Sequence, residues 1–189
     1  MLFERFKISA LSFICIMSLS ACQTTKNALD KYDRKNKEPK QTININAVSP
    51  EGVGKKIGTI TFQDSPRGLS IRPNLSDLPS GFHGFHIHEK GSCAPAIKNG
   101  RYHAAAAAGN HFNPLKVRHG SPNDGHLGDL PVLNVDSTGV AKTVVIAPRL
   151  KRSLIQGLSI VIHAGGDNYS DYPKPLGGDG DRIACGVIR

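Results

Sequence analysis

Apolar and polar residues alternate in short stretches from about residue 41 to the end of the chain. In residues 41–47 the side chains of Ile43, Ile45 and Ala47 fall on one face of an extended strand, because successive strand residues point to opposite faces. Turn-forming residues separate this stretch from similar ones at 56–63, 68–72, 82–88, 132–135, 141–146, 158–163 and 182–188. Short strands at such spacing predict an all-β sandwich or barrel.

Two long segments interrupt this pattern, residues 90–129 and 164–181. Neither alternates, and the alanine run in 102–108 is a weak helical signal that glycine and asparagine end at once. Loops of this length are rare in a compact domain unless they are functional. We therefore expect two functional loops, held by metal ions and a disulfide.

The first long loop contains three histidines and an aspartate, namely His111, His119, His126 and Asp129. Prolines and glycines between them exclude a regular helix or strand. Three imidazoles and one carboxylate form a closed tetrahedral set for zinc. The alternative is a polar surface loop that happens to carry histidines.

Three further histidines lie on expected strands. His86 and His88 share one face of the 82–88 strand, so they could present two imidazoles to one ion, although paired half-exposed histidines are also common. His163 ends the 158–163 strand and, taken alone, is an ordinary strand terminus.

The N-terminal segment is typical of an exported lipoprotein. Residues 1–21 have basic residues, an apolar run at 8–17 that is too short to span a membrane, and the ending Leu-Ser-Ala before Cys22. We expect a signal peptide over 1–21, a lipidated Cys22, a flexible tether over 22–40 and the folded domain over 41–189. An ordinary signal peptide with an incidental cysteine is the alternative.

The charge and the cysteine count bear on the possible partners and on a disulfide. The formal charge is +9 for the whole chain, and removal of Glu4, Arg5 and Lys7 with the signal leaves about +8. The basic residues are scattered, aromatic residues are few and no recognition motif is present, which argues against nucleic acid as a partner. After export Cys93 and Cys185 remain for a disulfide, with two free buried thiols as the alternative.

Taken together, these segments resemble copper/zinc superoxide dismutase, and more narrowly its bacterial periplasmic branch. The resemblance covers roughly residues 43–188 and rests on the motifs FHGFHIH at 82–88, HEKGSC at 88–93, HLGDLP at 126–131, HAGGDNYSD at 163–171, PLGGDG at 175–180 and RIACGVI at 182–188. It implies a Greek-key β-sandwich or barrel of about eight antiparallel strands with two long functional loops.

The resemblance also implies roles for individual residues. Copper would be bound by His86, His88, His111 and His163, and zinc by His111, His119, His126 and Asp129, with the His111 ring bridging both ions. Asp167 would link a copper-bound and a zinc-bound imidazole, Arg182 would dock the anion beside copper, and Cys93 and Cys185 would form the disulfide. His83 would be structural, while His103 has no counterpart in the motifs and is expected to be solvated.

The implied activity is dismutation of superoxide by copper redox cycling in the periplasm, with His111 and Arg182 taking part in catalysis. The rival hypothesis is a non-catalytic periplasmic module that binds copper and zinc. Lys90 and Lys98 are candidates for electrostatic steering of the substrate, for which superoxide dismutase is itself a known example. Gln23 after the lipidated cysteine favours the outer membrane, and the resemblance allows a homodimer or a monomer.

Overall fold

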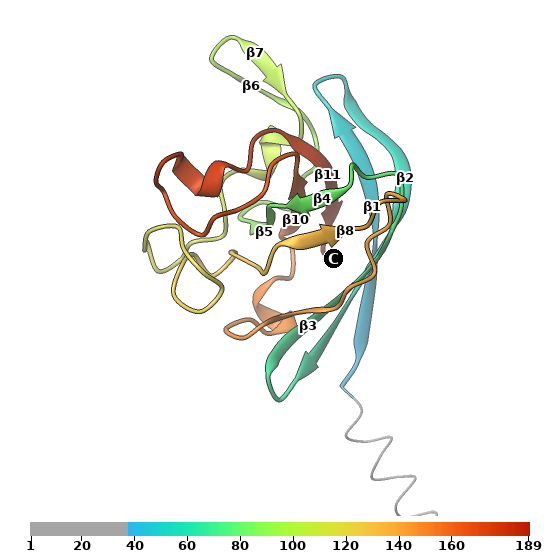
Figure 1. Ribbon diagram of the computed structural model, residues 1–189, viewed down its shortest axis with the longest axis vertical. Coiled ribbons are helices and arrows are strands. Elements are labelled where there is room, and N and C mark those ends of the chain that lie inside the picture. The colour runs from blue at the N-terminus through green and yellow to red at the C-terminus, as the bar shows by residue number, and fades with distance from the viewer. Residues whose placement is uncertain (1–37) are drawn as a thin grey trace, which may run out of the picture. The chain divides into compact units, whose positions relative to one another are not determined.

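The computed structural model describes residues 38–189, which consist of β-strands, loops and three short 3₁₀ turns (Figure 1). The expected signal peptide, Cys22 and most of the expected tether lie outside the described residues. The first strand begins at Lys40, one residue before the expected start of the domain. Within the described part, no helix is long and apolar enough to cross a membrane.

Seven strands form one antiparallel sheet in the order β5-β10-β11-β1-β2-β3-β9. Their bounds are β1 Lys40–Ser49, β2 Gly52–Ser65, β3 Gly68–Leu75, β5 Phe85–His88, β9 Val145–Ala147, β10 Ser159–His163 and β11 Arg182–Val187. Two separate pairs join β4 (Gly81–His83) to β8 (Leu133–Val135) and β6 (Ala96–Lys98) to β7 (Arg101–His103). The 3₁₀ turns are η1 Ala106–Ala108, η2 Arg152–Leu154 and η3 Pro175–Gly178.

The connections between strands give the Greek-key character. β3 pairs with β9, but the chain leaves β3 for β4, which pairs with β8 instead. The chain later returns from β9 to β10, which lies between β5 and β11. The sheet curls around the core (Figure 1), so the expected all-β fold is confirmed.

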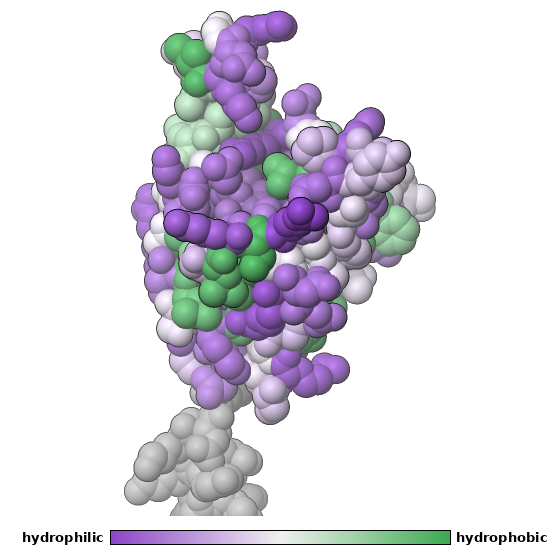
Figure 2. Space-filling view, turned by 90° about the vertical axis from the view of Figure 1, so that its left-hand side faces the viewer, coloured by the Kyte–Doolittle hydropathy of each residue, from purple (hydrophilic) through white to green (hydrophobic). Residues whose placement is uncertain are grey.

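The strands differ from expectation in a few places. The 82–88 stretch is two strands, because Gly84 separates the pairing of β4 with β8 from that of β5 with β10. The hairpin β6–β7 was not expected, and it stands out from the body of the protein (Figures 1 and 2). β3 continues through Pro73, which lies opposite Ile60 of β2.

A bulge in β1 interrupts its pairing with β2. The register shifts between Ile45 and Val48, but Ala47 still packs against the main core as alternation predicts, whereas Val48 is buried in a second cluster that includes Cys185. The largest fully buried side chains from both the sheet and β8 pack into one cluster, which includes Ile45, Ile60, Phe62, Leu69, Ile71, Phe85, Ile87 and Leu133. Phe85 and Ile87 thus anchor β5 in the core, and residues of the first long loop lie along the free edge of β5.

Candidate metal centre

The free edge of β5 is where the middle of the first long loop, at residues 111–112, meets the end of that loop, at residues 128–129. The backbone N–H of Phe112 donates to the Ile87 carbonyl at 2.8 Å, and the N–H of Ile87 donates to the Gly128 carbonyl at 2.9 Å. Isolated bridges pair His88 with His111 and His86 with Asp129. Backbone pairing thus places residues from three separate segments of the sequence side by side.

Gly128 makes this close approach possible. A Cβ atom at this position would collide with the carbonyl oxygen of Ile87 and with the backbone nitrogen of Phe112. Glycine is therefore required where the loop crosses the strand edge.

The four expected zinc ligands lie together and are buried. The donor atoms of His111, His119, His126 and Asp129 all lie within 4.8 Å of one another. Oδ1 of Asp129 is 3.0 Å from Nδ1 of His111 and 3.3 Å from Nδ1 of His126, while Oδ2 is 3.1 Å from Nδ1 of His119. Three imidazole nitrogens thus lie around one carboxylate. Together the three nitrogens and the carboxylate oxygen form a donor set suited to zinc.

Backbone donors and local charge hold this carboxylate in place. The N–H groups of Gly120 and His126 donate to Oδ2 of Asp129 at 3.1 and 2.8 Å. Burial alone would raise the pKa of Asp129, but hydrogen bonds to His111, His119 and other rings outweigh it and hold that pKa well below its usual range. Burial would likewise lower the pKa of His119, but the Asp129 and Asp167 carboxylates raise it to about 10.

The expected copper ligands His88, His111 and His163 form a second group with donor atoms within 4.8 Å. Nδ1 of His88 donates to the Gly109 carbonyl at 3.1 Å and Nδ1 of His163 donates to the Gly180 carbonyl at 3.3 Å. If both rings are neutral, each Nε2 atom is unprotonated and carries a lone pair. The two Nε2 atoms face each other at 3.4 Å. Two lone pairs at that separation are the arrangement that a cation between them would stabilise.

Burial keeps both rings neutral. It lowers the pKa of His163 to about 3, with a smaller contribution from the nearby ring of His86, and it lowers the pKa of His88 well below its usual value. Both rings are therefore ready to bind a metal at neutral pH without losing a proton first.

His86, the fourth expected copper ligand, lies beside this group and joins it through His111. Its ring stacks on the His111 ring with centroids 3.9 Å apart, and the donor atoms of His86, His111 and Asp179 form a third group within 4.8 Å. His111 is therefore common to all three groups, as expected for a ring that serves two ions.

Asp167 lies between the two sides of the centre. Its Oδ1 accepts a hydrogen bond from Nε2 of His119 at 2.9 Å and from the backbone N–H of Tyr169 at 2.7 Å. Its Oδ2 is 3.6 Å from Nε2 of His86. The contact with the zinc-side ring is thus close, and the contact with the copper-side ring is longer.

Unpaired polar atoms mark the cluster as a cation site. Ten buried side-chain nitrogen and oxygen atoms of residues 38–189 have no hydrogen-bond partner, and most of them belong to His86, His111, His119, His126, Asp167 and Asp179. Unpaired buried polar atoms are rare and costly, so their concentration here fits bound metal ions.

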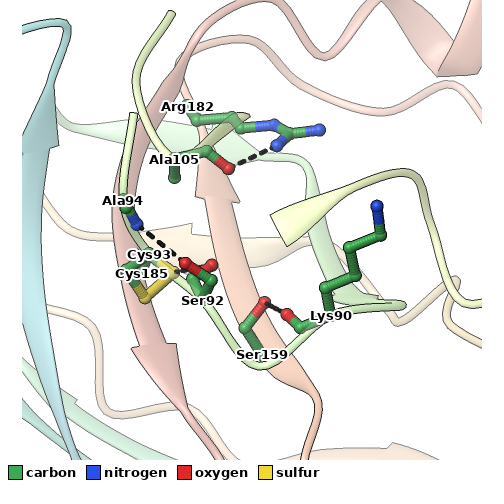
Figure 3. Close-up of a disulfide and its surroundings, with 8 residues drawn as sticks. All are labelled: Lys90, Ser92, Cys93, Ala94, Ala105, Ser159, Arg182 and Cys185. Carbon is green, nitrogen blue, oxygen red and sulfur yellow. Dashed lines mark hydrogen bonds between the residues drawn. A yellow bond between two sulfur atoms is a disulfide. The ribbon is translucent and has the colours of Figure 1, made fainter. Parts of the chain in front are cut away.

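Arg182 ties the start of β11 to the copper side. Its Nη1 donates to the carbonyl of Ala105 at 2.6 Å (Figure 3), and its Nη2 donates to the carbonyl of Gly109, also at 2.6 Å. The Gly109 carbonyl also accepts a hydrogen bond from Nδ1 of His88. The Arg182 guanidinium and this copper-side ring therefore share one acceptor. Arg182 is buried enough that its pKa is lowered, but it remains a cation at neutral pH.

The expected disulfide between Cys93 and Cys185 is confirmed, with Cα atoms 5.7 Å apart (Figure 3). It fastens the first long loop to β11, the strand that carries Arg182. Ser159 of β10 adds a second attachment through a 2.8 Å hydrogen bond from its hydroxyl to the Lys90 carbonyl.

Sequence reasoning missed two residues of the centre. Arg149 donates from Nε to the Pro122 carbonyl at 2.9 Å and from Nη2 to the carbonyls of Gly125 and His126 at 2.8 Å each, so it fixes the loop that carries the zinc-side rings. Nothing in the local sequence around Arg149 indicates this role. Asp179 lies within the PLGGDG motif, which gave the only signal for it.

His83 and His103 lie in the environments expected for them, and the two candidate steering lysines are on the surface. His83 is buried with its ring nitrogens 2.7 and 2.9 Å from the carbonyl oxygens of His163 and Pro79, which is a structural role. His103, Lys90 and Lys98 are exposed. The face that the long loops form is largely hydrophilic, with small separate apolar patches (Figure 2).

Comparison with known proteins gives consistent matches. Residues 56–188 match the family described as copper/zinc superoxide dismutase (SODC). A superoxide dismutase [Cu-Zn] of Escherichia coli (strain K12) is 50% identical over 152 residues, which cover 79% of this chain and 88% of the relative. The superoxide dismutase [Cu-Zn] 2 of Salmonella typhimurium is 46% identical over 93% of this chain and 97% of the relative. The solved structure of Cu/Zn superoxide dismutase from Brucella abortus superposes with a TM-score of 0.78 at 45% identity, covering 80% of this chain and 100% of that one.

Proposed function

The chain belongs to the copper/zinc superoxide dismutase family and is a superoxide dismutase, and we propose that its reaction takes place at the histidine cluster around His111. Superoxide is the substrate, and copper and zinc are the cofactors, one of each per subunit. The observation that supports this site is that His111 belongs to both the zinc-side and the copper-side donor groups.

In this proposal His86, His88, His111 and His163 bind copper, and His111, His119, His126 and Asp129 bind zinc. Copper supplies one-electron redox chemistry, whereas zinc is redox-silent and organises the loop. Overall, two superoxide anions and two protons become one dioxygen and one hydrogen peroxide.

The chain's own residues supply the protons and the charge. Nδ1 of His111 faces Asp129 at 3.0 Å, so the ring stays in place on the zinc side while its Nε2 is free to take up and release a proton. Arg182 provides a permanent positive charge that docks the anion beside the copper-side rings. Asp167 fixes the orientation of His119 and, less closely, that of His86.

Substitution of Arg182 tests the docking role. Arg182→Ala should lower kcat/KM by about tenfold or more while copper and zinc contents stay close to normal, because one charge-assisted contact to the substrate is lost. Arg101→Ala removes the same charge from the exposed strand β7 and should leave the rate nearly unchanged. Loss of copper from Arg182→Ala would show that the arginine supports the metal rather than the substrate.

A metal-binding module without turnover is the rival function, and the named relatives do not favour it. Protein reconstituted with copper and zinc should dismutate superoxide in a pulse-radiolysis assay. A fully loaded but inert protein would contradict the proposed site.

We also propose that the protein is exported, that Cys22 carries lipid, and that the domain works in the periplasm at the outer membrane. The basis is the lipoprotein-like segment around Cys22 and the similarity to bacterial superoxide dismutases. Cys22→Ser should move the protein from the membrane fraction to the soluble fraction, and mass spectrometry of the N-terminal peptide should show acyl groups on the native protein. An unmodified native cysteine would contradict this.

The assembly state is a separate question. The resemblance allows a homodimer, whereas a relative from Salmonella enterica, 49% identical, is described as a monomeric copper, zinc superoxide dismutase. Sedimentation equilibrium of the mature, metal-loaded protein distinguishes the two.

A further inference from the structure

We propose that Asp179 supplies a carboxylate oxygen to the copper-side donors, in addition to the histidines. This rests on the proposed site, because it concerns how that site binds copper. None of the expected roles includes Asp179, and the carboxylate that was expected near His86 is Asp167.

The position of Asp179 is the first argument. Its Oδ2 is 3.0 Å from Nε2 of His86, 3.5 Å from Nε2 of His111 and 3.9 Å from Nδ1 of His163. Donors about 2 Å from one ion lie roughly 3 Å apart, so the 3.5 Å from Oδ2 to Nε2 of His111, the nitrogen that faces the copper side, suits two neighbouring ligands. Asp167 is farther from the same nitrogen of His86, at 3.6 Å.

The second argument is that the partners of this carboxylate among the described residues are the rings of His86, His111 and His163. The side chain of Asp179 is only 4% exposed, and neither of its oxygens accepts a hydrogen bond from the described residues. Nε2 of His86, the nearest nitrogen, is also without a hydrogen bond despite the short distance. A buried carboxylate is strongly unfavourable unless a cation lies beside it, and a metal ion among these rings would supply that cation.

The surrounding backbone holds the carboxylate there. The N–H of Gly165 donates to the Asp179 carbonyl at 2.5 Å, and the N–H of Ala164 donates to the Asp181 carbonyl at 2.7 Å, which attaches this segment to the end of β10. Gly84 leaves the space for the side chain, because a Cβ atom there would collide with the Asp179 carboxylate.

An oxygen donor of this kind has a predictable effect. An anionic carboxylate favours Cu(II) over Cu(I), because Cu(I) prefers softer ligands. Removing the carboxylate should therefore raise the copper reduction potential and weaken Cu(II) binding by about tenfold. It should also change the Cu(II) electron paramagnetic resonance spectrum, since one oxygen donor is lost.

The test compares copper- and zinc-loaded native protein with Asp179→Asn, using Asp181→Asn as the matched control. Asp181 is exposed and lies two residues away, so its substitution removes the same charge without touching the centre. We expect Asp179→Asn to shift the spectrum and raise the potential, and Asp181→Asn to match the native protein. Spectra and potentials that are unchanged in Asp179→Asn would overturn the proposal.

A second variant covers the case in which Asp179→Asn does not fold. Gly84→Ala keeps the carboxylate but should push it away from the copper side, so the same spectral shift is expected. A crystal structure of the metal-loaded native protein with copper more than about 3 Å from Oδ2 of Asp179 would also overturn the proposal. Failure of the native protein to bind copper or dismutate superoxide would instead contradict the proposed site itself.

Discussion

Arg149 offers a direct test of how the zinc side is built, because its side-chain hydrogen bonds go to backbone carbonyls and not to a proposed ligand ring. Its guanidinium donates to three carbonyl groups of the loop segment 122–126, which leads into the zinc-side ring of His126. Arg149→Ala removes all three bonds. The loop should then sample other conformations, and zinc would have to select the competent one.

The size of the effect follows from those bonds. Hydrogen bonds from a charged donor contribute about 1.5 kcal/mol each, but these three share one partly exposed side chain and are not additive. A total of about 2–3 kcal/mol is reasonable, and at about 1.4 kcal/mol per tenfold it corresponds to zinc binding that is weaker by up to about 100-fold. Arg149→Lys should fall in between, because an ammonium keeps the charge but cannot reach three carbonyls in a fixed fork.

The assay is competition for zinc against a chelator at fixed pH, with unfolding measured in parallel. Arg118→Ala is the control, since Arg118 is exposed, precedes His119 and carries the same charge. Zinc affinity of Arg149→Ala within about twofold of the native value would show that the loop needs no such support.

Further predictions concern the covalent link, the loop crossing and pH. A disulfide that closes a loop of 92 residues restricts the unfolded chain, so replacing Cys93 and Cys185 with serine should lower the free energy of unfolding in urea by about 4.5 kcal/mol. Equal stability of the variant would contradict this explanation. Gly128→Ala should lower stability by about 1–3 kcal/mol in thermal unfolding because of the clash with Ile87, whereas Gly166→Ala, with ordinary space around it, should not. The pKa of about 10 at His119 means that zinc displaces a proton there, so zinc affinity should rise about tenfold per pH unit between about pH 6 and pH 8.

Local patterns in the sequence were sufficient for the strands and for most of the proposed ligands. Each of the eight expected strands overlaps an observed one, because alternation is a local property that burial enforces, although 82–88 is split in two and 141–146 overlaps β9 only at residues 145 and 146. The metal ligands could be predicted for the same reason. His86 and His88 are two residues apart on one strand, and three histidines lie close together in 111–129, so both patterns are visible in a short stretch of sequence. Even so, the bulge near Val48 and the break at Gly84 escaped prediction, since both depend on partners distant in the sequence.

Contacts between distant segments account for what the sequence did not reveal. Arg149 serves the metal centre through backbone carbonyls, so no side-chain pattern accompanies it. Asp179 follows a 3₁₀ turn and reaches His86 only because β5 and the segment after η3 are brought together in space. Charged residues in a glycine-rich turn are usually solvated, and only burial distinguishes Asp179 from its neighbour Asp181.

The charge of the centre connects these observations to the reaction. Two dications would bring four positive charges, and Asp129, Asp167, Asp179 and a deprotonated bridging His111 would bring four negative ones. With Asp179 in place the proposed centre would be close to neutral, and the proposed docking residue Arg182 would be the charge that an approaching anion meets at the copper side. Attraction of superoxide would then depend on one guanidinium that two carbonyls and the nearby disulfide hold in place, rather than on the metals themselves. A neutral centre also favours release of the product, because hydrogen peroxide is uncharged and a strongly positive site would keep binding anions from solution.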